Sequence, residues 1–159
     1  MTAGAEAGAL PPVNERSALQ SFASWTGTAF LVFGILGFIP GVTDDFAELR
    51  AAGHRSTAQL FGVFDVSILL NLIHIVLGIA GLWLARTWAG ARIYLIGGGA
   101  ICLALWIYGL AVGRDSSANF IPVDSADNWL HFAVGLAMLA AGIVLGRQVP
   151  HQKEAASAT

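Results

Sequence analysis

The sequence predicts an all-α membrane protein, a four-transmembrane-helix bundle built from two tandem helical hairpins. Three observations support this fold class. Of 159 residues, 56% are hydrophobic and 11% are charged, whereas a soluble domain has roughly a quarter of its residues charged. Most charges lie between long apolar runs, and four runs reach the roughly 20 residues that a helix needs to cross a hydrocarbon core of about 30 Å. The second and fourth runs also repeat one polar pattern.

The expected spans are residues 22–41, 60–85, 93–112 and 128–146. The first span follows some twenty polar or small residues and is too long for the apolar core of a signal peptide, so we expect it to be retained. Pro40 and Gly41 should end it. After it, Thr43 or Asp44 can cap a short surface helix that stops at Gly53.

The remaining elements have their own start signals. The segment Ser56-Thr-Ala-Gln59 has the spacing of a capping box and is expected at the head of the second span. The connection RTWAGAR is so short that the second and third spans should be antiparallel neighbours. Asp124-Ser-Ala-Asp127 precedes the fourth span and predicts an N-terminal cap with acidic residues at the positive end of the helix dipole.

The distribution of basic residues predicts that both termini are cytoplasmic. With that orientation the inner segments hold five basic residues and the outer loops hold three, in agreement with the positive-inside rule. The inner residues are Arg16, Arg86, Arg92, Arg147 and Lys153, and the outer residues are Arg50, Arg55 and Arg114. The chain then divides into a disordered cytoplasmic tail (1–20), a four-helix membrane domain (21–147) and a second disordered cytoplasmic tail (148–159).

An internal repeat links the second and fourth spans. NLIHIVLGIA begins at Asn71 and NWLHFAVGLA begins at Asn128, and the two share Asn, His, Gly and Ala at the same offsets. The two spans run in the same direction because one span separates them, so the pattern predicts a parallel duplication of one hairpin.

The repeated polar residues lie on one face of each helix. Asn71 and His74 share a stripe with glycines at helical spacing, and Asn128 and His131 do the same. Lipid offers no hydrogen-bond partner, so these stripes should face the interior of the bundle. We expect the four residues to form an interhelical polar cluster that locks the second span to the fourth.

Two other roles compete for the histidines. In the first, His74 and His131 line a proton or substrate path, with Ser67 and Asp65 as further members, because ionisable groups inside membranes are often functional. In the second, the two imidazoles bind haem iron from opposite sides. Measured from Arg86 and Arg147, the histidines differ in height by about 6 Å, which argues against a shared haem plane. A lined cavity that reaches the outer face would favour transport, and a closed hydrogen-bond cluster would favour a structural role.

Small-residue pairs occur in three spans, as Gly37/Gly41, Gly109/Gly113 and Gly142/Gly146. Such pairs permit close helix packing and, as an alternative, a homodimer interface. Cys102 lies within the third span and is expected to be a small packing residue. We find no phosphate-binding loop, no metal-ligand spacing, no Ser/His/Asp arrangement and no basic aromatic surface for nucleic acid. The sequence therefore predicts no enzyme, no cofactor and no bound metal.

The motifs GFIPGVT, LFGVFDVSILLNLIHIVLGIAGL and IPVDSADNWLHFAVGLAMLAAG resemble a small bacterial membrane-protein family, mainly actinobacterial, that is defined only as a domain of unknown function. The resemblance covers residues 24–146, and the two Asn-x-x-His patterns are its most specific parts. DSADN occurs where the family has an Asn-Thr-Ala-Asp-Asn run, and Asp124 and Ser125 preserve the capping role. The resemblance implies a four-helix integral membrane protein without an established activity.

These observations predict a multi-pass protein of the bacterial plasma membrane. We expect a non-enzymatic accessory subunit or scaffold, whose partners are the lipid bilayer and a larger membrane complex or a second copy of the chain. A small transporter or proton-conducting protein is the alternative, and a haem-binding electron-transfer protein is a further one.

Overall fold

The computed structural model describes residues 16–147 except 54, 114, 115, 117 and 123. Most of the two predicted tails therefore lies outside the described residues. The first helix begins at Ala18, within the range that the sequence analysis assigned to the N-terminal tail. Ser17 caps this helix, because its side chain accepts a hydrogen bond from the Gln20 amide and Gln20 completes the capping box.

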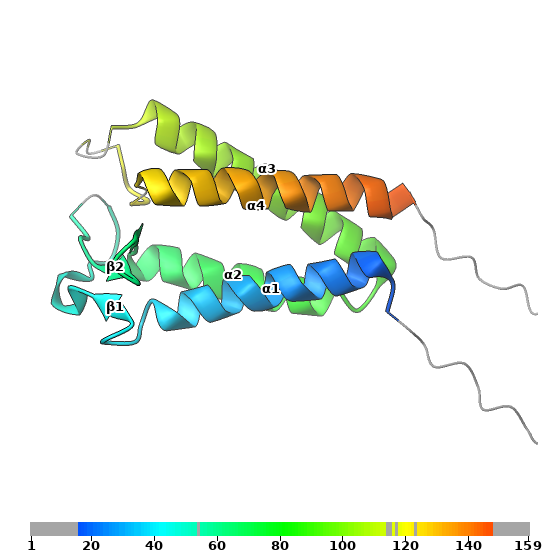
Figure 1. Cartoon of the computed structure of the whole chain (residues 1–159), viewed down its shortest axis with the longest axis horizontal. Helices are drawn as coiled ribbons and strands as arrows, with labels where there is room; N and C mark the ends of the chain where they lie inside the picture. Colours follow the sequence, from blue (N-terminus) through cyan, green and yellow to red (C-terminus); the bar gives the residue numbers. More distant parts are fainter. Residues whose placement is uncertain (1–15, 54, 114–115, 117, 123, 148–159) are drawn as a thin grey trace, which may run out of the picture.

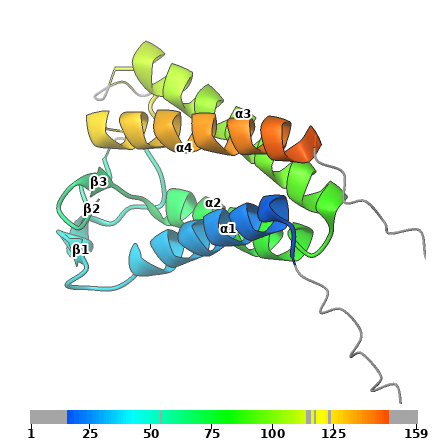
Figure 2. The same ribbon diagram turned by 45° about the vertical axis from the view of Figure 1, so that its right-hand side comes forward.

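Four α-helices make up most of the described residues and confirm the all-α class. They are α1 (Ala18–Leu36), α2 (Ile68–Leu84), α3 (Trp88–Ala111) and α4 (Ser125–Val144), and the 3-10 helices η1 (Phe46–Glu48) and η2 (Leu145–Arg147) are short additions. α1 packs mainly against α2, and α3 packs mainly against α4. Figure 1 shows the resulting hairpins as two layers, and α3 rises from the end of α2 to join α4. The turned view in Figure 2 shows the same separation.

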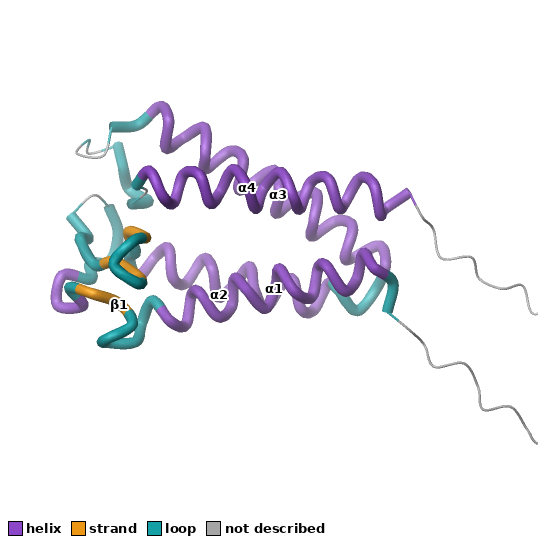
Figure 3. Tube along the Cα trace, in the orientation of Figure 1, coloured by secondary structure: helices purple, strands orange, loops and turns teal. Residues whose placement is uncertain are grey.

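The bundle has two different ends. The start of α1, the α2–α3 turn and η2 lie together at one end, which we call the terminal end (Figure 1). At the other end, called the sheet end, strands β1 (Thr43–Asp44), β2 (Gln59–Leu60) and β3 (Phe64–Asp65) form an antiparallel sheet in the order β1-β2-β3. Figure 3 shows these strands beside the ends of α1 and α2.

The sheet corrects two expectations for the segment before α2. Residues 60–67 do not form the start of a helix, because Phe61 and Gly62 adopt left-handed conformations that turn the chain between β2 and β3. Ser56 does not cap α2. Its hydroxyl donates a hydrogen bond to the Val66 carbonyl at 2.5 Å, and the cap is Ser67, whose hydroxyl accepts from the Leu70 amide at 3.1 Å.

Two further expectations, for the end of the first span and for the segment after it, are also wrong. The predicted surface helix after the first span is only the three-residue η1, preceded by β1. α1 ends at Leu36, before Pro40 and Gly41, so the proline does not terminate it. By contrast the capping role of Asp124 is confirmed: it accepts a hydrogen bond from the Asp127 amide at 2.7 Å, within a capping box.

Helix packing depends on small residues, and large apolar side chains point outward. Gly27, Gly78 and Gly135 are buried at helix contacts, while Trp25 is 75% exposed and Ile93 is 67% exposed. This distribution is typical of membrane proteins, where lipid solvates the large apolar side chains and small residues let the helices approach closely.

In the part of the chain that the structure describes, three helices are long and apolar enough to cross a membrane, namely α1, α3 and α4 continued by η2. α2 is also apolar but has only 17 residues. Although α2 and α3 are joined by a short turn, each packs mainly within its own hairpin. Length and composition thus support a membrane protein.

The terminal end is closed by an apolar cluster. Leu19, Tyr94, Leu95 and Met138 are buried there and come from three different helices. The Gln20 amide group also donates to the carbonyl oxygens of Ala85 and Arg86, at 3.1 Å each, which ties α1 to the end of α2. The apolar cluster therefore joins the two hairpins at this end.

Candidate functional site

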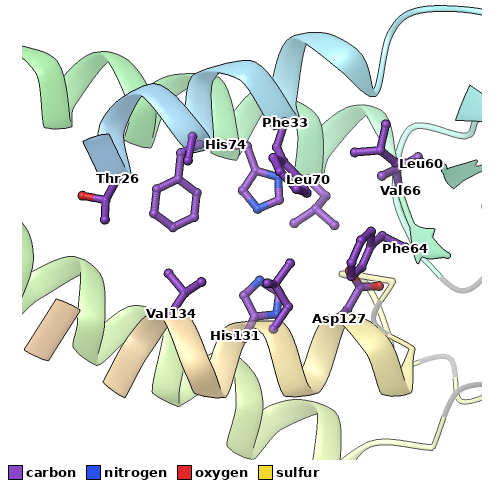
Figure 4. Close-up of a pocket in the computed structure, with 13 residues that line it drawn as sticks. Thr26, Phe33, Leu60, Phe64, Val66, Leu70, His74, Asp127, His131 and Val134 are labelled. Carbon is purple, nitrogen blue, oxygen red and sulfur yellow. The ribbon is translucent and has the colours of Figure 1, made fainter. Parts of the chain in front are cut away.

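The two repeated histidines meet between the hairpins. His74 comes from α2 and His131 from α4, and their ring centroids are 6.4 Å apart with the planes inclined by 29°. Figure 4 shows the rings pointing toward each other across a cavity. On the other side, His74 packs against Phe30 of α1, with centroids 5.6 Å apart.

The helix caps explain why the histidines are opposite each other. His74 follows its cap Ser67 by the same number of residues as His131 follows its cap Asp124. The sequence analysis measured height from Arg86 and Arg147 instead and expected an offset. α2 ends at Leu84 while α4 continues to Val144 and into η2, so the two arginines do not mark the same depth.

The cavity has a volume of about 140 Å³ and a largely apolar lining. Its polar lining residues are Thr26, His74, Asp127 and His131. The apolar lining comes from both hairpins and from the sheet end, and consists of Ala29, Phe30, Phe33, Leu60, Phe64, Val66, Leu70, Leu130 and Val134. A cavity of this size is close to an engineered protein cavity of about 150 Å³ that binds benzene.

Asp127 connects the cavity to the sheet. Its carboxylate oxygen Oδ2 accepts hydrogen bonds from the backbone amides of Asp65 in β3, at 3.0 Å, and of Asp124, at 3.2 Å. The side chain is only 5% exposed. Asp127 therefore links the start of α4 to the first hairpin, and it also supplies the carboxyl group in the wall of the cavity.

Asn71 and Asn128 lie elsewhere, each within its own hairpin. The Asn71 side chain covers Gly37 at the end of α1, and the Asn128 side chain covers Gly109 of α3, so closely that neither glycine could carry a Cβ without displacement. Neither asparagine lines the cavity. Both side-chain polar atoms of Asn71 lack a hydrogen-bond partner among the described residues.

The other helix contacts correspond between the hairpins in the same way. Gly78 of α2 packs on Leu31 of α1, and its counterpart Gly135 packs on Leu103 of α3. Gly27 meets Gly78, and Gly99 meets Gly135. The equivalence suggested by the repeat in α2 and α4 therefore extends to contacts made by α1 and α3.

Most glycines of the small-residue pairs pack within the chain. Gly142 contacts Ile96, and Gly146 contacts the Arg92 side chain. A Cβ at Gly41 or Gly113 would meet no described atom within 4 Å. The pairs thus contribute mainly to packing inside the bundle.

Asp65 and Ser67 flank the cavity without lining it. Asp65 accepts a hydrogen bond from the Gln59 side chain at 2.9 Å, and Ser67 is fully buried as the cap of α2. Within the described residues no group of three or more His, Cys, Asp or Glu side chains could hold a metal ion. Cys102 is buried in α3 beside Gly135.

Sequence reasoning recognised Asp127 as a capping residue but missed its place in the cavity wall. One signal could have found it, because Asp127 precedes His131 by one helical turn and so lies on the same face of α4. The aromatic residues Phe30 and Phe33 carried no such signal, since phenylalanine is common throughout apolar spans.

Comparison with protein families shows which family the chain belongs to. The model of the Domain of unknown function DUF4383 matches residues 20–144. No curated protein and no solved structure matches the chain. The match includes all four helices except a few terminal residues, so the chain belongs to the DUF4383 family, whose function is unknown.

Proposed function

We propose that this chain is a small proton-linked transporter of the bacterial plasma membrane, with no enzymatic activity. One observation carries the proposal: His74 and His131 face each other across a cavity that also contains Asp127. The scaffold hypothesis expects a closed hydrogen-bond cluster of the two histidines and two asparagines. The asparagines instead lie within separate hairpins, and ionisable groups around an intramembrane cavity are typical of transport paths.

In the proposed topology all four helices cross the membrane and both termini are cytoplasmic. α2 has 17 residues and so is about 25 Å long. It packs against α1, so we propose that the two helices cross the membrane together. Arg16, Arg86, Arg92 and Arg147 lie at or near the terminal end, which agrees with a cytoplasmic position for that end.

The topology can be tested by cysteine labelling. In a Cys102→Ala background, a cysteine at Arg86 should react with a membrane-impermeant maleimide only after the cells are opened. A cysteine at Phe61, which is 52% exposed at the sheet end, should react in intact cells. Labelling of the Arg86 position from outside would overturn the proposed orientation.

The cavity extends from the sheet end toward the terminal end. Leu60, Phe64 and Val66 at the sheet end form part of its lining. Towards the terminal end, Phe30 and Val134 line the cavity and also pack on the buried apolar cluster there. The proposed transport cycle opens the cavity toward the sheet end and toward the cytoplasm in turn. Rocking of one hairpin against the other would alternate this access.

We also propose that the two hairpins arose by duplication. The supporting evidence is the equivalence of contacts, in which Asn71 covers Gly37 as Asn128 covers Gly109. Parallel repeats with a site between them occur in several transporter folds, so duplication agrees with a site at the interface between the hairpins.

A proton-flux assay tests the proposed function. Proteoliposomes would contain a trapped pH-sensitive dye. A pH gradient would be applied across their membrane, with a potassium flux to balance the charge carried by protons, and the rate of proton movement would be measured from the dye. The wild type should move protons faster than protein-free liposomes. The double variant His74→Ala, His131→Ala should lose most of this rate, whereas His151→Gln, which changes a histidine outside the spans, should retain it. An equal rate in wild type and double variant would contradict the proposal.

The same purified protein tests the haem alternative. The cavity of about 140 Å³ is smaller than the roughly 300–1,000 Å³ of common ligand sites, so haem would require the hairpins to separate further. A Soret band that is present in the wild type and absent from the double variant would replace the transport proposal with electron transfer.

One observation favours the accessory-subunit hypothesis as a second candidate. Gly97 of α3 is exposed, with no described atom within 4 Å of a Cβ placed on it, and exposed Ile93 and Ile101 lie one turn to either side. This face could accept a helix of a partner or of a second copy of the chain. Gly97→Leu should then remove a co-purifying partner or dimer without lowering the melting temperature.

A further inference from the structure

The cavity has the size and the walls of a site for a single small ring. Its volume is about 140 Å³, close to that of a protein cavity known to hold benzene. Phe30, Phe33 and Phe64 supply aromatic surface from α1 and from β3. Figure 4 shows Phe33 beside His74, and Phe64 next to Asp127 at the end nearest the sheet. An apolar ring matches the size and the walls of this space.

The carboxyl group of Asp127 has no basic partner in this space. No lysine or arginine is among the residues that line the cavity, and the salt bridge found among the described residues joins exposed Arg50 and Glu48. Burying a carboxylate in apolar surroundings is costly unless a cation accompanies it. Asp127 should therefore hold either a proton or a cationic ligand.

The groups around Asp127 increase its preference for a cation. Asp124 is the N-cap of α4, and Asp65 of β3 donates its amide to the Asp127 carboxylate, so two further acids are close. The other titratable groups near it are His131, one turn along α4, and His74 of α2, both of which line the cavity. Among these described neighbours none is permanently positive.

The histidines can contribute to binding in a neutral form. His131 is 5% exposed, and its Nδ1 makes no hydrogen bond of standard geometry with a described residue, although the Asp127 backbone lies close to the ring. A neutral imidazole offers one acceptor and one donor, and aromatic faces attract cations at short range. An ammonium group could thus be held between a carboxylate, an imidazole and phenylalanine rings.

From these observations we propose that the cavity binds a small organic amine with one ring, in its protonated form, in exchange for a proton on Asp127. The inference rests on the proposed transport function and names its substrate class. On binding, the ammonium ion enters, the Asp127 carboxyl group loses its proton to water, and no covalent bond of the ligand changes. Return of a proton to Asp127 would release the amine, so each amine that crosses would be exchanged for protons.

Binding of benzylammonium to the full chain in detergent provides the test. Calorimetry in two buffers with different ionisation enthalpies counts the protons released, and about one proton per bound amine is expected. Below the pH at which Asp127 loses its proton, the affinity should rise about tenfold per pH unit, as required for exchange of one proton. Benzyl alcohol has the same ring without the charge, and it should bind at least tenfold more weakly.

Two matched variants locate the charge. Asp127→Asn keeps an oxygen acceptor for the Asp65 amide but cannot lose a proton, so it should bind benzylammonium at least tenfold more weakly and without pH dependence. Asp124→Asn changes the neighbouring carboxyl group, which does not line the cavity, and asparagine caps helices as well as aspartate. Because the Asp124 charge adds to the preference of Asp127 for a cation, this variant should bind more weakly than the wild type but clearly better than Asp127→Asn, and it should keep the release of about one proton.

Several results would overturn the inference. Equal binding of benzylammonium and benzyl alcohol, or binding without proton release, would exclude exchange at a buried acid, and both measurements use the wild type alone. Unchanged affinity in a folded Asp127→Asn variant would place the site elsewhere. If liposomes conduct protons through His74 and His131 but no amine binds, the amine inference fails and the transport proposal survives. If the amine binds but no protons move even when benzylammonium is supplied on one side of the liposome membrane, the transport proposal fails instead.

Discussion

The two hairpins have equivalent helix contacts but differ at the position next to their asparagines. Asn71 and Asn128 each cover a glycine at the sheet end of the preceding helix. The residue before Asn71 is Leu70, and the residue before Asn128 is Asp127, and both line the cavity. One wall of the cavity is therefore apolar where the corresponding wall carries a carboxyl group.

This difference separates the residues that determine helix packing from the residue that places an ionisable group in the cavity. We call the packing of the two helices in a hairpin its frame. The equivalent glycines and asparagines determine how closely the helices of each hairpin approach. The acid occurs in one hairpin only, and the sheet of the other hairpin supplies the Asp65 amide that it binds. The site thus depends on both hairpins, although their frames are alike.

The largest loss of stability is expected from a substitution that disrupts the packing of α1 on α2 in the first hairpin. A methyl group at Gly78 would lie 2.5 Å from the backbone nitrogen of Leu31, so Gly78→Ala should force α1 and α2 apart. We expect a loss of about 1–3 kcal/mol, the usual cost of overpacking, seen as a lower melting temperature in detergent. Gly97→Ala, on the open face of α3, is the matched control and should have little effect.

The corresponding change in the second hairpin sharpens the comparison. A methyl group at Gly135 would be 3.0 Å from its nearest neighbours, Cys102 Cβ and the Gly99 carbonyl among them. Gly135→Ala should therefore destabilise the protein less than Gly78→Ala does. A larger loss of stability in Gly135→Ala would contradict this order and show that the helices of the second hairpin adjust less well to an added methyl group.

The helix caps should have intermediate effects. Ser67→Ala and Asp124→Ala each remove a side-chain acceptor at a helix start, which costs about 0.5–2 kcal/mol. Asp124→Ala should be the more damaging, because it also breaks the reciprocal capping box with Asp127. Thermal unfolding of the two variants and of Asp124→Asn, which retains an acceptor, checks this order.

The smallest effect is expected at the terminal end. Gln20→Ala removes two hydrogen bonds to the carbonyls at the end of α2 and also the acceptor of the Ser17 amide in the capping box, at a net cost of about 1 kcal/mol because these bonds are partly exposed. Gln20→Glu is an informative partner variant, because a carboxylate cannot donate to these carbonyls. Equal melting temperatures for wild type and Gln20→Glu would show that the two bonds contribute nothing measurable.

The sequence was sufficient for the class of fold and for some local signals. Composition and run length predicted an all-α membrane protein, and the cap at Asp124 followed from residue type and spacing. It was insufficient for the segment before α2, because strands of two residues have no periodicity to detect. The apolar run beginning at Leu60 therefore resembled a continuous helix.

Residue spacing also could not predict which helices the repeated polar residues contact. Helical periodicity placed Asn71 and His74 on one stripe, but it does not say which helix that stripe faces. Asn71 proved to contact α1, while His74 faces α4. Residues one turn apart can have different neighbours where two helices diverge.

By itself the sequence determined that this protein is apolar, helical and built around two Asn-x-x-His patterns, because hydropathy, periodicity and capping depend on neighbouring residues. Only the tertiary structure decided that His74, His131 and Asp127 share one cavity. Their meeting depends on how closely each hairpin packs on its glycines and on the sheet that holds the start of α4. Those contacts join residues far apart in the chain, and no local pattern specifies them.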